Sequence, residues 1–86
     1  MTDDQITNRG WSVPIYRAVE AAGGPVAVAN AFGFRSATTP MHWYKQGTIQ
    51  TRYIDALCKL GGYAIKPGDM AYDVAMRRLG TEKAAA

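Results

Sequence analysis

The chain has 86 residues, of which 48% are hydrophobic, 20% are charged and 10% are aromatic, and its formal net charge is +3. This length has room for one small globular domain and excludes a multidomain enzyme, while the hydrophobic content excludes a disordered tail. The single cysteine, Cys58, excludes an intramolecular disulfide framework and a cysteine-rich zinc site and is typical of a reducing compartment.

The start of the chain and its hydropathy bear on where the protein works. Residues 1–4 include two aspartates, whereas a secretory signal peptide begins with basic residues. No apolar stretch approaches the roughly 20 residues that a membrane-spanning helix needs. We therefore expect a cytoplasmic protein that makes no membrane contact.

The positive charge is concentrated in the middle third of the chain. Residues 30–60 carry four basic side chains and one acidic side chain, whereas basic and acidic residues balance in the rest of the chain. Many proteins carry such an excess on a solvated face, but a local positive field also suits the approach to a nucleic-acid backbone. The five charged residues of this segment are Arg35, Lys45, Arg52, Lys59 and Asp55.

Residues 1–10 are expected to form a flexible N-terminus, after which local signals predict the first helix. Ser12 is a favourable N-cap, and Pro14 falls in the first turn, where its missing N–H is not needed. Trp11 precedes the cap and is spaced to pack onto Tyr16 as a hydrophobic staple. The inward face of this helix is then expected to carry Ile15, Ala18, Val19 and Ala22.

A second helix of about two turns is predicted after the glycine pair at positions 23 and 24. Pro25 opens it as the first helical residue, and it ends at Phe32. Gly33 follows at a turn position that favours a positive φ, which other residues reach only at a cost. Ala29, four residues before Gly33, fits a place where two helices cross closely.

The third helix is predicted to follow a connecting turn over residues 34–38. Because the residue before a proline prefers extended backbone, Thr39 is expected to cap a helix that runs from Pro40 to about Gln46 and ends at Gly47. Trp43 is placed to pin this helix to the body of the domain. A fourth helix is expected from about Thr51 to Leu60, with Ile54, Leu57 and Cys58 facing inward.

The last third of the chain allows two interpretations. A helix over 69–79 is favoured, because Ala, Met, Arg and Leu dominate its second half. The alternative is a β-hairpin that turns at residues 66–69, since apolar residues alternate on both sides of this turn. The helix has more apolar surface than a small body can bury, so a dimer interface is expected at Met70, Tyr72, Val74 and Met76.

Together these elements predict a mainly all-α fold with four to five short helices. Two short helices joined by a glycine-containing turn describe a helix-turn-helix. The predicted helix-turn-helix core spans residues 11–62, a packing and dimerisation segment spans 63–80, and a frayed tail spans 81–86. The flexible terminus and the tail flank one small domain.

Several short motifs in this core resemble those of a known family. They are Gly23-Gly24, Ala27-Val28-Ala29-Asn30-Ala31-Phe32-Gly33, Trp43-Tyr44-Lys45-Gln46-Gly47 and Ile49. This pattern is similar to the Cro-type and YdaS-type helix-turn-helix regulators of bacteriophages and prophages, over Ile15 to about Gly62. The resemblance implies a lambda-repressor-like domain and a small, usually dimeric repressor. Its helix after the turn is expected to enter the major groove of a short double-stranded operator.

Two features depart from the usual pattern of that family. The stretch from Gly33 to Trp43 is one residue longer, and Pro40 stands where the family has a residue in the middle of a helix. For this reason the candidate DNA contacts are chosen by chemistry rather than by transfer of positions. The candidates for base contacts are Arg35, Ser36, Thr38, Thr39, Met41, His42 and Gln46, and those for phosphate contacts are Lys45, Gln50, Thr51 and Arg52.

The assigned roles follow from hydrogen-bonding capacity. An arginine such as Arg35 can bond to guanine O6 and N7, and a glutamine such as Gln46 can pair with adenine. Thr38 or Met41 can touch a thymine methyl group, whereas Lys45 and Arg52 suit phosphates, which set position without reading sequence.

Other chemistries find little support in the sequence. His42 is the single histidine, so a multi-histidine metal centre is excluded. Asp69 and Asp73 lie on one helix face, but carboxylates early in a helix are explained by its dipole. Cys58 lacks the partners of a nucleophile and fits a core position. We expect no catalysis, no metal, no cofactor and no small-molecule ligand.

The sequence thus predicts a DNA-binding repressor of phage, prophage or mobile-element type. A homodimer would bind an inverted repeat with its reading helices about 34 Å apart and block a promoter. A toxin–antitoxin or excisionase-type regulator would use the same fold. The alternative outside DNA binding is a protein-interaction module, in which a degenerate helix-turn-helix contacts RNA polymerase or another regulator.

Overall fold

Helices account for all regular structure in the part of the chain that the computed structural model describes, namely the backbone of residues 1–85 and the side chains of residues 1–80. No strand occurs in these residues, so the all-α prediction is confirmed. Six helices are present rather than four to five. They are α1 (Asp3–Asn8), α2 (Val13–Ala21), α3 (Pro25–Phe32), α4 (Thr38–Gln46), α5 (Thr51–Leu60) and α6 (Pro67–Ala85).

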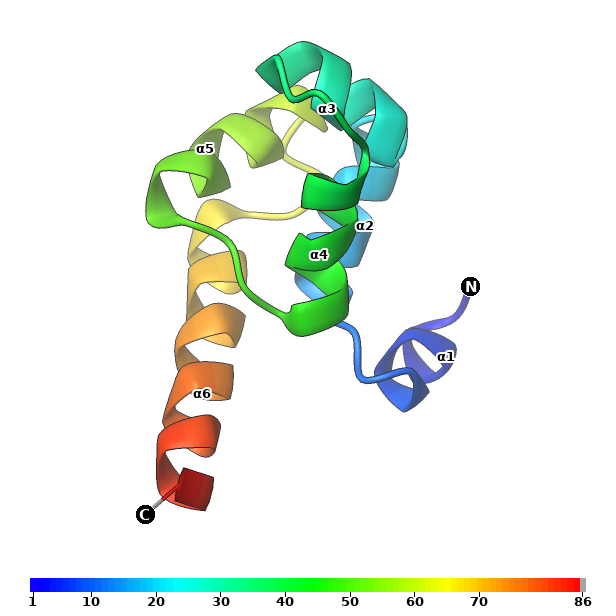
Figure 1. The fold of residues 1–86 in the computed structure, drawn as a ribbon. Helices are drawn as coiled ribbons and strands as arrows, with labels where there is room; N and C mark the ends of the chain where they lie inside the picture. Colours follow the sequence, from blue (N-terminus) through cyan, green and yellow to red (C-terminus); the bar gives the residue numbers. More distant parts are fainter. Residues whose placement is uncertain (86) are drawn as a thin grey trace.

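The helices α2 to α5 and the first half of α6 enclose one core, and α1 lies at its edge (Figure 1). The second half of α6 runs away from this body, and α1 lies beyond the start of α2. No described helix combines the length and the apolar character needed to cross a bilayer. The buried core consists of Ile15, Ala18, Val19, Val28, Trp43, Tyr44, Ile49, Ile54, Leu57, Cys58 and Met70.

The start of α2 has the predicted cap and staple. The Ser12 hydroxyl accepts a hydrogen bond from the Ile15 N–H at 3.4 Å, and Pro14 lies in the first turn. The ring centroids of Trp11 and Tyr16 are 5.7 Å apart. The predicted starts and ends of α3 and α5 are also confirmed, since α3 spans Pro25–Phe32 and α5 spans Thr51–Leu60.

The N-terminus is helical, in contrast to the flexible segment predicted for residues 1–10. Thr2 and Gln5 form a reciprocal capping box at the start of α1, and Ile6 is fully buried. Arg17 of α2 forms an ion pair with Asp3 at 3.0 Å. Capping, burial and pairing together hold this short helix against α2.

The helix α4 begins at Thr38, two residues before its predicted start at Pro40. Its N-cap is Ala37 rather than Thr39. Ser36 makes the earlier start favourable, because its hydroxyl accepts a hydrogen bond from the Thr38 N–H at 3.1 Å. Pro40 then occupies the first turn, where no intrahelical donor is required, and its ring is buried.

The last segment is one helix, and the alternative hairpin is wrong. α6 begins at Pro67 and continues past Gly80 to Ala85. Its start agrees with the preference for proline in a first helical turn. The predicted frayed tail, residues 81–86, lies outside the residues whose side chains are described.

Candidate nucleic-acid interface

A tight turn joins α3 to α4 in the helix-turn-helix arrangement. Gly33 has φ 75°, in the left-handed region, as the sequence predicts. The N–H of Phe34 donates to the Ala29 carbonyl at 2.9 Å, which closes the end of α3. Ala29 itself is only 4% exposed, consistent with a close approach of the two helices.

One aromatic cluster fixes the inner side of α4. Trp43 is buried, and its ring centroid lies 5.8 Å from that of Phe32, 5.7 Å from that of Phe34 and 5.5 Å from that of Tyr53. These partners come from α3, the turn and α5. The tryptophan therefore joins three elements, as its predicted pinning role requires. We call Phe32, Phe34, Trp43 and Tyr53 the Trp43 cluster.

A second contact region holds the neighbouring residue of α4. The Tyr44 ring centroid lies 5.0 Å from that of Trp11 and 5.1 Å from that of Tyr16, in an edge-on arrangement with Tyr16. The N–H of Ser12 donates to the Tyr44 carbonyl at 2.7 Å. Because Trp43 and Tyr44 are both held, the rotation of α4 about its axis is fixed.

This rotation leaves one polar face of α4 open to solvent. Thr38, His42 and Lys45 follow one another at spacings of four and three residues, so they share a helix face. Thr39 and Gln46 flank them, and all five side chains are exposed. The helix has no acidic residue. We call Thr38, Thr39, His42, Lys45 and Gln46 the α4 stripe.

Two predicted contacts lie in the turn before α4. Arg35 and Ser36 are exposed there. The Ser36 hydroxyl donates to the Thr38 Oγ1 at 2.8 Å, in addition to accepting from the Thr38 N–H. Ser36 therefore has a clear local role in starting the helix.

Met41 lies apart from the other predicted base contacts. Its side chain is only partly exposed and packs against the core. The reason is its position, next to the buried Pro40 and one turn before the buried Tyr44. Met41 therefore has a packing role in this structure, and its predicted base contact stays a prediction.

The predicted phosphate contacts of α5 lie at its beginning. Gln50, Thr51 and Arg52 are exposed. Gln50 is the N-cap but makes no side-chain capping bond. The Arg52 guanidinium lies 4.8 Å from the centroid of the Tyr53 ring and donates to the Tyr53 hydroxyl at 3.1 Å. This contact connects Arg52 to the Trp43 cluster.

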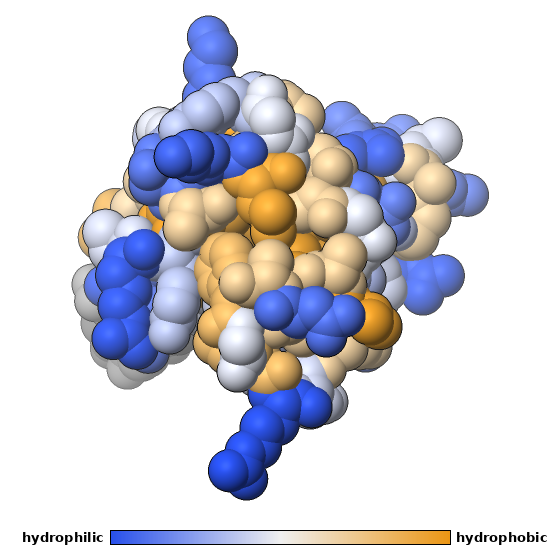
Figure 2. Space-filling view, turned by 90° about the horizontal axis from the view of Figure 1, so that it is seen from above, coloured by the Kyte–Doolittle hydropathy of each residue, from blue (hydrophilic) through white to orange (hydrophobic). Residues whose placement is uncertain are grey.

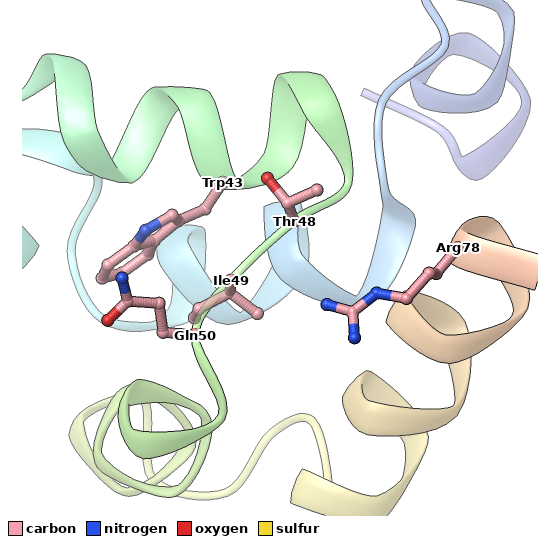
Figure 3. Close-up of a pocket in the computed structure, with 5 residues that line it drawn as sticks. All are labelled: Trp43, Thr48, Ile49, Gln50 and Arg78. Atoms are coloured by element: carbon pink, nitrogen blue, oxygen red, sulfur yellow. The ribbon is translucent and has the colours of Figure 1, made fainter. Parts of the chain in front are cut away.

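An open pocket lies between the end of α4, the start of α5 and α6 (Figure 3). Its volume is about 290 Å³. Figure 3 shows Arg78 of α6 extending toward the connection that carries Thr48 and Ile49. The lining residues are Trp43, Thr48, Ile49, Gln50 and Arg78.

A polar network that the sequence does not predict holds α6 against the start of α2. The buried Ser12 hydroxyl donates to Asp73 Oδ2 at 2.6 Å, and Arg77 Nε donates to the same oxygen at 3.1 Å. Arg77 also donates to the Trp11 carbonyl at 2.9 Å. Arg77 is thus a structural residue. We call Ser12, Asp73 and Arg77 the α6 anchor.

The predicted dimerisation residues divide between the core and the surface. Met70 is fully buried, and Val74 is partly buried and packs against the core. Met70 faces the core because α6 docks on α2 and α5, so its assignment to an interface between copies is corrected, whereas the interface role of Val74 stays a prediction. Tyr72 and Met76 are 69% and 48% exposed, and Leu79, one turn further along the same face, is 49% exposed.

The remaining reactive side chains show no arrangement suited to metal binding. Among residues 1–80, no group of three or more His, Cys, Asp or Glu side chains could hold a metal ion. Cys58 is buried, and burial raises the pKa of its thiol. The thiol is therefore protonated at neutral pH, which fits its predicted place in the core.

Comparison with known proteins gives no matching family model, no matching curated protein and no matching solved structure.

Proposed function

We propose that this chain is a sequence-specific DNA-binding regulator, a repressor of phage, prophage or mobile-element type that acts in the bacterial cytoplasm. The α4 stripe carries this proposal. It is exposed, has no acidic member and lies on a helix whose inner face is fixed by Trp43 and Tyr44. A rigid helix with outward polar side chains is what insertion into a major groove requires.

The chemistry of the exposed side chains assigns their roles. Gln46 can pair with adenine, Arg35 can bond to guanine, and Thr38 or Thr39 can pack on a thymine methyl group. His42, in the middle of the stripe, faces the base edges between them. Four exposed side chains at the end of α4 and the start of α5 are assigned to the DNA backbone, namely Lys45, Gln50, Thr51 and Arg52.

The proposed operator-binding form is a homodimer. Tyr72, Met76 and Leu79 form an exposed apolar row on α6 at spacings of four and three residues. Packing this row against a second copy would bury large side chains that the single chain leaves in water. Two-fold symmetry would then place two α4 helices on an inverted repeat, about one DNA turn or 34 Å apart.

The decisive experiment selects bound fragments from a random duplex pool with the purified full chain. Selection at two salt concentrations separates specific binding from general attraction to phosphates. We expect enrichment of a short inverted repeat that persists at the higher salt concentration. Recovery of no motif, with binding that disappears at moderate salt, would contradict the proposal.

Two variants test the division between base and backbone contacts on the selected operator. Arg35→Ala is expected to relax preference at one operator position and to cost about 1–3 kcal/mol. Lys45→Ala is expected to weaken binding equally on all sequences and to reduce the salt slope by about one. Equal losses on every sequence for Arg35→Ala would remove its assigned base contact.

A second candidate function, a protein-interaction module that contacts RNA polymerase or another regulator, is favoured by the apolar surface near α3. Figure 2 shows an apolar area at the end where α3 lies, with hydrophilic side chains around it. Val26 of α3 is 65% exposed, and Leu60 at the end of α5 is 41% exposed. Val26→Asp should leave DNA selection unchanged and abolish binding to purified bacterial RNA polymerase if this surface is the functional one.

A further inference from the structure

Arg78 occupies a position on the surface that its sequence context does not predict. It belongs to α6, yet it lines the pocket beside Thr48, Ile49 and Gln50, which connect α4 to α5 (Figure 3). None of the five lining residues is acidic. Within residues 1–80, no hydrogen bond or ion pair occupies the Arg78 guanidinium, whose five N–H groups are donors.

The α6 anchor fixes this position. Arg77, the preceding residue, is bound to Asp73 and to the Trp11 carbonyl. The Arg77 side chain also lies directly against Gly47, the residue that ends α4. The turn of α6 that carries Arg78 is therefore held beside the end of α4 and cannot rotate freely.

The pocket adjoins the side chains already assigned to the DNA backbone. Gln50 lines it, and Thr51 and Arg52 follow directly in α5. Thr48 and Gln50 are exposed and line the same pocket, and Figure 3 shows the Gln50 amide on the Trp43 side, away from the guanidinium. The arginine fork itself suits the oxygens of a phosphodiester, and Thr48 and Gln50 add neutral donors elsewhere in the pocket.

We propose that Arg78 binds a DNA backbone phosphate, so that the DNA-contact surface extends from α4 and α5 onto α6. This inference rests on the proposed DNA-binding function and adds one charged contact from a helix otherwise assigned to dimerisation. The contact sets position and affinity but reads no base.

The test uses Arg78→Gln in the full chain, with Lys59→Gln as a matched control. Lys59 is also exposed, and it lies at the other end of α5 from Gln50. Binding of the selected operator and of a scrambled duplex is measured by fluorescence anisotropy over a series of salt concentrations. Circular dichroism and sedimentation check that fold and oligomeric state are unchanged.

The expected result is a salt slope smaller by about one for Arg78→Gln, and a loss of affinity of about tenfold at 0.1 M salt on both duplexes. Lys59→Gln should retain the full slope. A wild-type slope and affinity for Arg78→Gln, while Arg52→Gln loses one unit of slope, would overturn this inference and leave the proposed function standing. Absence of any duplex binding by the wild-type chain would overturn both.

Discussion

Two helices of this small domain, α4 and α6, are held in place by different physical means. The inner side of α4 is fixed by aromatic packing on both Trp43 and Tyr44. Among the described side chains of α6, Met70 is the one large side chain that is fully buried, Val74 packs partly against the core, and the polar α6 anchor adds directional bonds. Aromatic packing gives α4 a rigid setting, whereas α6 relies more on directional bonds.

The largest expected effect concerns the Trp43 cluster. Trp43→Ala removes a buried ring that contacts α3, the turn and α5, and should lower the free energy of unfolding by about 3–5 kcal/mol. Urea denaturation measures this loss. Trp11→Ala, at a partly exposed ring, is the control and should cost less. Unchanged melting of Trp43→Ala would mean that α4 is not held by this cluster.

The next effect concerns the α6 anchor. Asp73→Ala leaves the buried Ser12 hydroxyl without its acceptor and removes the partner of Arg77, so it should cost about 1–3 kcal/mol. Hydrogen exchange should accelerate in α6 more than in α4, because the lost bonds hold α6 alone. Equal acceleration in both helices would show that the two regions unfold as one unit.

A smaller effect on stability is expected from substituting two glycines, and comparing them separates backbone strain from contact with α6. Gly47→Ala and Gly33→Ala both place alanine in the left-handed region, at a cost of about 1–2 kcal/mol each. At Gly47 the new methyl group would also meet the Arg77 side chain, whereas at Gly33 the space is open. We expect Gly47→Ala to be the more destabilising of the two in thermal unfolding. The same loss for both would mean that Arg77 moves aside freely.

The smallest expected effect is a dependence of the free energy of unfolding on alkaline pH. Burial raises the pKa of Tyr44 above its ordinary value of 10.0. The folded state therefore retains this proton more strongly than the unfolded state, so the stabilisation is complete below pH 10 and is lost as the pH rises through the raised pKa. Tyr44→Phe should show a shallower loss of stability above pH 10 in urea titrations. Parallel curves for the two proteins would contradict this assignment.

Local signals in the sequence are sufficient to predict most of the helices that form the body. Serine, proline and glycine at helix ends predicted α2, α3 and α5, and the spacing of apolar residues placed Trp43 inward. α1 is not among the predicted helices, although its capping pair, Thr2 and Gln5, has the spacing of a capping box and is a local signal.

The candidate site was harder to predict, because its remaining features depend on how α6 docks. Ser12 and Asp73 are 61 residues apart, so no local pattern connects them. Apolar residues occur around much of α6, and only the docking angle decides that Met70 faces the core while Tyr72 faces water. The same docking places Arg78 beside the start of α5.

The distance along the chain between Ser12 and Asp73 also has a consequence for how the domain folds. Consecutive helices such as α2 and α3 meet after short connections, whereas attachment of α6 to the start of α2 closes a loop of 61 residues. The entropy lost on closing a loop rises with its length, and contacts between distant residues slow folding. The body is therefore expected to condense first and α6 to dock late, so a chain still emerging from the ribosome would hold α4 in place before its last helix has docked.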